Sequence, residues 1–165
     1  MQFIKHHAIM FVILLAIFAV VGIIVGPAMV PSRHHGPSGC TSNLRVLSKA
    51  ILAYESDYNG HLPNALTWPS DLCRYVETER LYHCPEDRRK GERSYEMLQR
   101  WSYQHLSDAD AHRTILLYEI GKSGPEYRHN GGMNVGHGDG HVWWYSHAKM
   151  TPEIILRGVL EEEKP

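Results

Sequence analysis

The segment from Tyr127 to Tyr145 combines five glycines with three histidines and ends in the bulky run Val142–Tyr145. Glycine reaches backbone conformations with positive φ that residues with a Cβ adopt only with strain. Glycines at this density therefore mark tight turns or close approaches between chain segments, and the bulky run favours a strand. The segment predicts a turn, a short strand, a tight turn at Asp139-Gly140 and a second strand.

The run from Ala8 to Val30 carries no charge and consists mostly of large aliphatic residues. About 20 such residues are enough to cross the roughly 30 Å hydrocarbon core of a bilayer as a helix. We therefore expect a membrane anchor in residues 1–30, with a cleaved signal peptide as the alternative. Proline and glycine recur in residues 31–40, which predicts a tether, and residues 41–165 are long enough for one domain. Basic residues flank both ends of the run, so charge alone leaves its orientation open.

The composition argues against a nucleic-acid partner. The chain has 17 Lys and Arg residues against 18 Asp and Glu residues. Affinity for a phosphate backbone comes chiefly from clustered basic side chains, and the one such cluster, residues 88–90, has acidic neighbours on both sides. We interpret this cluster as a solvated loop.

The spacing of apolar residues predicts an α+β domain. Intervals of three and four place one stripe along a helix of about 17 residues that Asn59-Gly60 ends, and a short helix is expected near residues 70–76. Strands are expected near residues 95–103, at 114–120 and in both arms of the final hairpin, and Thr151-Pro152 begins a last helix. The predicted fold class is thus an N-terminal transmembrane helix followed by a long amphipathic helix packed on an antiparallel sheet. The helical stripe consists of Leu44, Leu47, Ile51, Tyr54 and Tyr58.

Several motifs resemble one family in the same order along the chain. His129, nine further residues and then Asp139-Gly140 resemble the C-terminal signature of the prepilin-type processing-associated His-X(9)-Asp-Gly proteins, which are relatives of type II secretion pseudopilins. Residues 40–45 are similar to that family's Cys-x-x-Asn-Leu-Arg helix, and residues 58–63 to its Asn-Gly-x-x-Pro exit. Smaller matches lie at residues 83–87, 94–95 and 113–119. The signature positions in this chain are Asn43, Leu44, Glu119, His129, Asp139 and Gly140.

The resemblance implies a pilin-like fold and a structural or assembly role. It implies a single-pass protein of a bacterial cytoplasmic membrane, with its C-terminal domain outside the cytoplasm and with pilin-like subunits and an assembly platform as partners. Pilin precursors carry a glycine cleavage site and an acidic residue within the apolar segment, and residues 1–30 contain neither in those positions. Processing by a prepilin peptidase and polymerisation therefore stay open.

The histidine-rich segment also suggests a metal site as a competing interpretation. Alternate residues of a strand face the same side, so His137, Asp139 and His141 could converge with His129, or with Glu119 nearby, on a zinc ion. A tight turn at Asp139-Gly140 would destroy that alternation, and His129 and Asp139 would then hydrogen-bond each other or nearby backbone groups and fix the loop. Calcium is a further alternative, with Glu119, Glu126 and Asp139 as the available carboxylates.

Three cysteines in an extracytoplasmic domain leave at least one without an intramolecular partner. Cys73 and Cys84 lie close in sequence on either side of a turn-like segment, which makes them the candidate disulfide. The alternative is a pair of buried thiols.

These observations favour a membrane-anchored, pseudopilin-like structural protein of a type II secretion or type IV pilus-like system, with no catalysis and no cofactor. The alternative is a membrane-anchored metal-binding domain or zinc-dependent hydrolase built on His129, Asp139 and His141.

Overall fold

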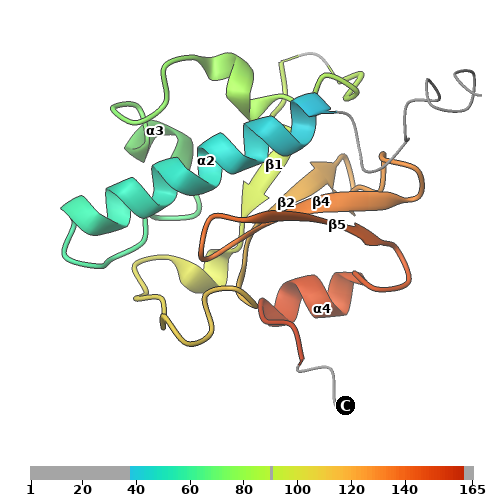
Figure 1. Cartoon of the computed structure of the whole chain (residues 1–165). Helices are drawn as coiled ribbons and strands as arrows, with labels where there is room; N and C mark the ends of the chain where they lie inside the picture. The colour runs from blue at the N-terminus through green and yellow to red at the C-terminus, as the bar shows by residue number, and fades with distance from the viewer. Residues whose placement is uncertain (1–37, 90, 162–165) are drawn as a thin grey trace, which may run out of the picture. The chain divides into compact units, whose positions relative to one another are not determined.

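The computed structural model describes residues 38–89 and 91–161, which belong to one compact unit. A long helix, α2, opens this range, and short helical turns and a small sheet follow (Figure 1). The strands are short because turns and irregular loops occupy much of the chain after α2. The elements in chain order are α2 (Ser38–Asp57), α3 (Trp68–Asp71), η2 (Glu79–Tyr82), β1 (Tyr95–Met97), η3 (Gln99–Trp101), β2 (Ile115–Gly121), β3 (Gly124–Pro125), β4 (Gly132–His137), β5 (Val142–Ser146) and α4 (Pro152–Arg157).

The sheet is antiparallel throughout, with the strand order β1-β2-β4-β5 and with β3 paired to the end of β2. A register shift between Ile115 and Leu117 marks a bulge in β2. The extra residue of a bulge breaks the strict alternation of side chains. Accordingly, the consecutive residues Leu116 and Leu117 both belong to the hydrophobic cluster that contains the α2 residues.

Helix α2 covers one face of the sheet (Figure 1). Leu44, Leu47 and Ile51 of the predicted stripe are fully buried and pack with Tyr95 and Trp68 in the first hydrophobic cluster. The helix approaches β4 closely, since a Cβ added to Gly136 would lie 2.4 Å from Ser48 Oγ. A residue without a side chain at this position lets α2 rest directly on the strand.

Helix α4 lies on the opposite side of the sheet (Figure 1). It begins with the predicted proline at its first turn, after Thr151, and ends at Gly158 in a left-handed conformation. Ile155 packs with Met133 and Val135 of β4 in a second hydrophobic cluster. All six residues of β4 are buried because both faces of this strand are covered.

Two tight turns frame β4, and both follow the predicted pattern. Asn130 and Gly131 have positive φ, and His129 and Gly132 exchange two backbone hydrogen bonds around them. Positive φ at both central residues is the property that two-residue hairpin turns of type I′ require. Between β4 and β5, Gly140 has a φ of +84° in the predicted Asp139-Gly140 turn.

The predicted fold class is wrong as stated. Within residues 38–89 and 91–161, no helix combines the length and the apolar character that a membrane span requires. The predicted anchor at Ala8–Val30 lies outside the described residues. The sheet is small and has apolar residues on both faces, so a single long helix cannot bury it, and α2 and α4 cover opposite sides. The arrangement expected from the family resemblance, one long helix laid over one sheet, therefore does not describe this domain.

Several predicted boundaries also need correction. Helix α2 begins at Ser38, so the last part of the predicted tether, residues 31–40, is helical. The helix expected near residues 70–76 is the single turn Trp68–Asp71. Tyr58 lies one residue beyond the end of α2 and is 46% exposed, because the chain leaves the helical path before Asn59, which has positive φ.

Candidate functional site: a buried histidine between two carboxylates

His129 lies at the start of the Asn130-Gly131 turn and is 1% exposed. Its Nε2 atom is 2.9 Å from Oε1 of Glu119 in β2, and its Nδ1 atom is 2.8 Å from Oε2 of Glu86. The side chain of Glu119 is fully buried, whereas that of Glu86 is 46% exposed. The imidazole therefore bridges an interior carboxylate and a carboxylate at the surface.

The two carboxylates decide the charge of His129. Burial lowers the pKa of an imidazole because the charged form loses its hydration, but hydrogen bonds and charges from Glu119 and Glu86 raise it. Together the contributions of the two carboxylates outweigh burial, so the pKa of His129 lies above the ordinary value of 6.5. A protonated ring donates one hydrogen bond from each nitrogen, which matches the two carboxylate contacts.

A chain of hydrogen bonds connects this pair to the first turns of α2. Asn134 of β4 donates from Nδ2 to Glu119 Oε1 over 3.1 Å, and its Oδ1 accepts from Thr41 Oγ1 over 3.1 Å. The other oxygen of Glu119, Oε2, is buried and has no hydrogen-bond partner among the described residues. The indole of Trp144 donates to the backbone carbonyl of His129 over 2.9 Å, which fixes the turn that carries the ring.

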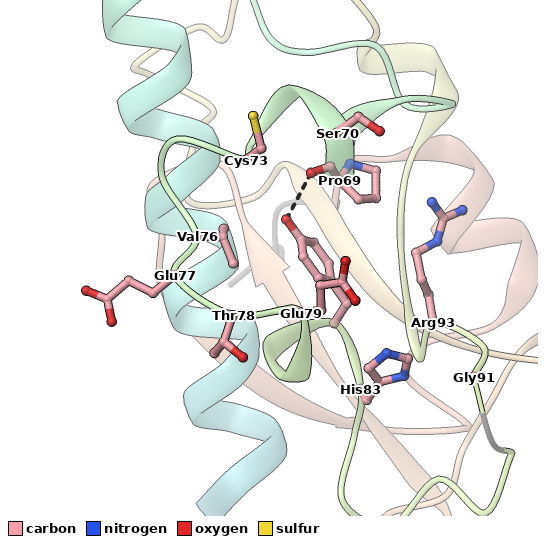
Figure 2. Close-up of a pocket in the computed structure, with 11 residues that line it drawn as sticks. Pro69, Ser70, Cys73, Val76, Glu77, Thr78, Glu79, His83, Gly91 and Arg93 are labelled. Atoms are coloured by element: carbon pink, nitrogen blue, oxygen red, sulfur yellow. Dashed lines mark hydrogen bonds between the residues drawn. The ribbon is translucent and has the colours of Figure 1, made fainter.

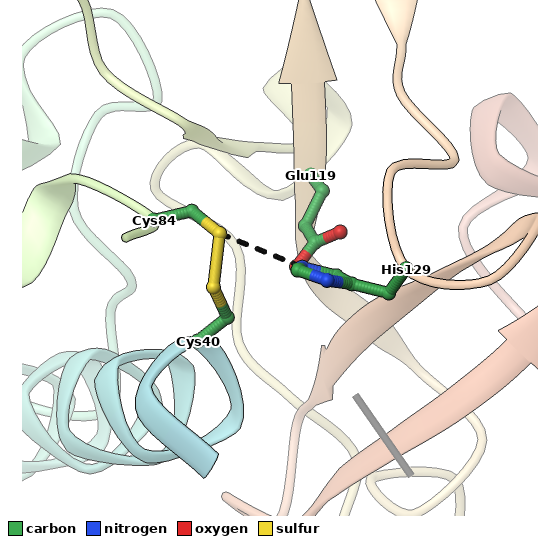
Figure 3. A group of neighbouring side chains, drawn as sticks. All are labelled: Cys40, Cys84, Glu119 and His129. Atoms are coloured by element: carbon green, nitrogen blue, oxygen red, sulfur yellow. Dashed lines mark hydrogen bonds and ion pairs between the residues drawn. A yellow bond between two sulfur atoms is a disulfide. The ribbon is translucent and has the colours of Figure 1, made fainter. Parts of the chain in front are cut away.

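Cys40 and Cys84 form a disulfide directly beside His129 (Figure 3). His129 Nε2 is 3.5 Å from Cys84 Sγ. The bridge joins the first turn of α2 to the loop after η2, across a sequence separation of 44 residues. Closing a loop of that length restricts the unfolded chain and stabilises the fold by about 4 kcal/mol in the chain-entropy model.

The disulfide corrects the predicted Cys73–Cys84 pair. Cys84 bonds to Cys40 instead, and Cys73 is an exposed free thiol. Asn43 explains part of the difference, because its Nδ2 atom donates to the carbonyl of His83 over 2.9 Å and holds the Cys84 loop against α2. The neighbouring signature residue Leu44 is a core residue with no exposed surface.

The predicted metal set comes together only in part: His137, Asp139 and His141 are neighbours, but His129 is not among them. His137 faces Tyr145, whose hydroxyl is 3.1 Å from His137 Nε2, while His129 contacts Glu119 farther along the sheet. His137 pairs with Ile115 at the start of β2, whereas Glu119 lies near the other end of β2. The structure therefore separates His129 from His137, Asp139 and His141.

Asp139 and His141 close the turn between β4 and β5. Asp139 Oδ1 accepts a hydrogen bond from the backbone N–H of His141 over 3.1 Å and contacts its ring nitrogen. Asp139 and His129 thus each fix their own turn and do not bond each other. The His141 ring stacks on His137 with 4.2 Å between ring centroids. Burial, followed by the charge of His141, lowers the pKa of His137 to about 4.

An open pocket of about 460 Å³ lies between α3 and η2 (Figure 2). Tyr82 lies at its wall and donates a hydrogen bond to the carbonyl of Pro69 over 3.2 Å. Cys73, His83 and Arg93 also line it. None of the signature residues lines this pocket, so the buried cluster around His129 remains the candidate site.

Four residues of that cluster carry metal-ligating atoms that lie close together. One ligand atom from each of Cys40, Cys84, Glu119 and His129 lies within 4.8 Å of the other three, and all four residues are buried. Sequence reasoning identified Glu119 and His129 but missed the cysteines as their neighbours. The sequence offered one signal for them: Cys40 and Cys84 each lie in a family-like motif, at residues 40–45 and 83–87.

Comparison of the chain with protein-family models, with curated proteins and with solved structures found no match. The family resemblance of residues 40–145 accordingly stays a prediction from motifs.

Proposed function

We propose that this protein is a non-catalytic structural component of an extracytoplasmic assembly of the type II secretion or type IV pilus-like kind. In this proposal Ala8–Val30 anchors the chain in the cytoplasmic membrane, and the described domain lies on the far side. Its partners are pilin-like subunits and an assembly platform, with polymerisation left open.

The observation that carries the proposal is the bonding of His129. A general base needs a lone pair and must reach the proton that it removes. His129 is 1% exposed, and both ring nitrogens contact carboxylates of the same chain. A ring held in this way stabilises the junction between β2, the Asn130-Gly131 turn and the Cys84 loop.

The disulfide supports the proposed compartment. Disulfides persist in oxidising environments outside the cytoplasm and are rare where cellular thiols keep cysteines reduced. The Cys40–Cys84 bridge is buried and connects the start of α2 to the main domain. A bond at this position holds the start of α2 to the loop after η2.

Membrane fractionation with chemical crosslinking tests the proposal on the full chain. The wild-type protein is expected in the membrane fraction, crosslinked to pilin-like or platform proteins. The double substitution Leu15→Arg with Ile17→Arg places two charges in the apolar run, at a cost of roughly 5–7 kcal/mol for membrane insertion. It should remove the chain from membranes and abolish the crosslinks.

Leu15→Ala with Ile17→Ala is the matched control, because it changes the same two positions without adding charge, and it should leave both results unchanged. Recovery of the wild-type chain as a monomer without structural partners would contradict the assembly role. So would a hydrolytic activity of the anchored chain that His129→Gln abolishes.

A further inference from the structure

The four residues around the disulfide come from four separate segments of the fold (Figure 3). Cys40 belongs to α2, Cys84 to the loop after η2, Glu119 to β2 and His129 to the turn before β4. Two sulfurs, an imidazole nitrogen and a carboxylate oxygen form a donor set that suits zinc in a closed, four-coordinate site. All four residues are buried, so an ion at their centre would be shielded from water.

One pair of donor atoms already has the spacing of a zinc tetrahedron. Zn–S bonds of about 2.3 Å and Zn–N bonds of about 2.0–2.1 Å place sulfur and nitrogen ligands about 3.5 Å apart at the tetrahedral angle. Cys84 Sγ and His129 Nε2 are 3.5 Å apart. The distance between His129 Nε2 and Glu119 Oε1 is 2.9 Å and would widen to about 3.3 Å once an ion replaces the proton between them.

The neighbours of these ligands supply the outer contacts that metal sites use. Ligating histidines usually donate their second ring N–H to a carboxylate, which fixes the orientation of the ring. Glu86 occupies that position, 2.8 Å from His129 Nδ1. Asn134 donates to Glu119 Oε1 in the same way. The outer contacts of a metal site are therefore present in the disulfide-bonded form.

We propose that the disulfide and a zinc site are alternative states of this one cluster: the reduced chain binds Zn²⁺ through Cys40 Sγ, Cys84 Sγ, His129 Nε2 and Glu119 Oε1, and oxidation releases the ion. The Cys40–Cys84 bond excludes the metal because its sulfurs are not thiolates. Cleavage lets the sulfurs separate to the roughly 3.8 Å that two zinc-bound thiolates need.

The exchange balances in electrons and protons. A dithiol or phosphine reductant supplies two electrons, the S–S bond breaks, and two protons complete the thiols. Zinc binding then releases both thiol protons and the Nε2 proton of His129, while the Nδ1 proton stays on the ring and is donated to Glu86. In the reverse direction the thiolates give two electrons to a disulfide oxidant, which is reduced to two thiols; the S–S bond forms again, the ion leaves, and His129 Nε2 takes up a proton from solvent.

A second pocket lies next to Glu86, outside the cluster. It has a volume of about 430 Å³, and Glu86 and Arg128 are among the residues that line it. Glu86 contacts His129 directly, so the pocket lies one side chain away from the ligands. In this proposal an ion or a small reductant enters from this pocket, past Glu86.

Metal titration of the full chain in detergent tests the proposal with the same sequence in two redox states. After reduction with a phosphine and exclusion of oxygen, Co²⁺ should bind once per chain and give the visible bands of tetrahedral cobalt with thiolate ligands. Zn²⁺ should displace it and protect Cys40 and Cys84 from alkylation. The oxidised chain should show none of these responses.

Substitutions separate this site from other ligands. Glu119→Gln should weaken binding at least by the roughly 10–100-fold that loss of an outer contact costs, and Cys40→Ser should abolish the thiolate bands. Cys73→Ser and His141→Ala are the controls, since Cys73 is exposed and His141 belongs to the separate turn at Asp139; neither should change the affinity.

Loss of the disulfide destabilises the fold, so the near-ultraviolet circular dichroism of the wild-type chain is measured in the same titration. Recovery of the folded spectrum on addition of one equivalent of zinc would support the proposal. A reduced chain that takes up no metal, folded or unfolded, would overturn it. Equal binding by the oxidised chain or by Cys40→Ser would overturn it as well.

Discussion

His129 Nε2 lies 2.9 Å from Glu119 Oε1, and both side chains are inaccessible to solvent. Burying an ion pair costs desolvation energy, and this cost is offset only when the geometry is good and additional hydrogen bonds are present. Asn134 on Glu119 and Glu86 on His129 supply those additional bonds. Removing one partner would leave the other buried without its counter-charge, so the native state should lose stability.

Glu119→Gln tests this dependence. The substitution preserves the shape of the side chain but leaves His129 without its interior counter-charge, so we expect the free energy of unfolding to fall by about 2–3 kcal/mol. Urea denaturation of the oxidised chain measures the change. The exposed Glu77→Gln is the matched control and should stay within about 0.5 kcal/mol of wild type. Equal effects of the two substitutions would show that the buried pair has no special role.

The raised pKa of His129 predicts a loss of stability at alkaline pH. A group whose pKa is higher in the folded state than in the unfolded state contributes its full stability below the unfolded pKa of about 6.5. That contribution disappears as the pH rises through the raised pKa of the folded state. Urea unfolding from about pH 6 to about pH 9 should therefore show falling stability in wild type. His129→Gln should remove this part of the pH dependence, and a Cys73→Ser background prevents disulfide exchange. An unchanged slope in His129→Gln would refute the assignment.

His137 predicts the opposite pH dependence on the acidic side. Its pKa is about 4 in the folded state because burial and the nearby His141 disfavour the charged ring. The unfolded chain takes up this proton near pH 6.5, so stability should fall between about pH 6.5 and pH 4, by about 3 kcal/mol. His137→Leu should flatten this part of the curve, whereas exposed His147→Gln should preserve it. A steep acid transition that survives His137→Leu would point to another group.

The contact between α2 and β4 predicts a coupling between Gly136 and Ser48. A Cβ at residue 136 would lie 2.4 Å from Ser48 Oγ, so Gly136→Ala forces the helix or the serine to move, at a cost of about 1–3 kcal/mol. Ser48→Ala removes the obstructing oxygen. In a double-mutant cycle the two substitutions together should cost at least about 1 kcal/mol less than the sum of the single effects. Strict additivity would show that the helix does not rest on this strand as described.

The local elements were predictable because their signals are short-range. The apolar stripe from Leu44 to Ile51 and the proline after Thr151 identify α2 and α4, and Asp139-Gly140 identifies the final turn. The predicted fold class is wrong because it depends on tertiary packing, namely on which faces of the sheet other elements must cover. The bulge at Ile115–Leu117 and the two-sided burial of β4 are not evident from an alternating pattern.

The site shows the same limit. The motif residues His129 and Glu119 could be selected from the sequence, but their contact depends on a hairpin turn that brings residue 129 beside β2. The disulfide was assigned to Cys73 and Cys84 because they are close in sequence, whereas pairing depends on Cα separation and direction in the fold. Cys40 and Cys84 have Cα atoms 5.1 Å apart despite a sequence separation of 44.

Thiol trapping followed by peptide mapping of the full chain, isolated from its native source, tests the central claim most directly. The account predicts that Cys40 and Cys84 are recovered as one disulfide-linked peptide pair and that Cys73 alone reacts with the trapping reagent. Recovery of Cys40 and Cys84 as free thiols, or of a Cys73–Cys84 linkage, would contradict the claim that an extracytoplasmic disulfide beside His129 holds this domain together.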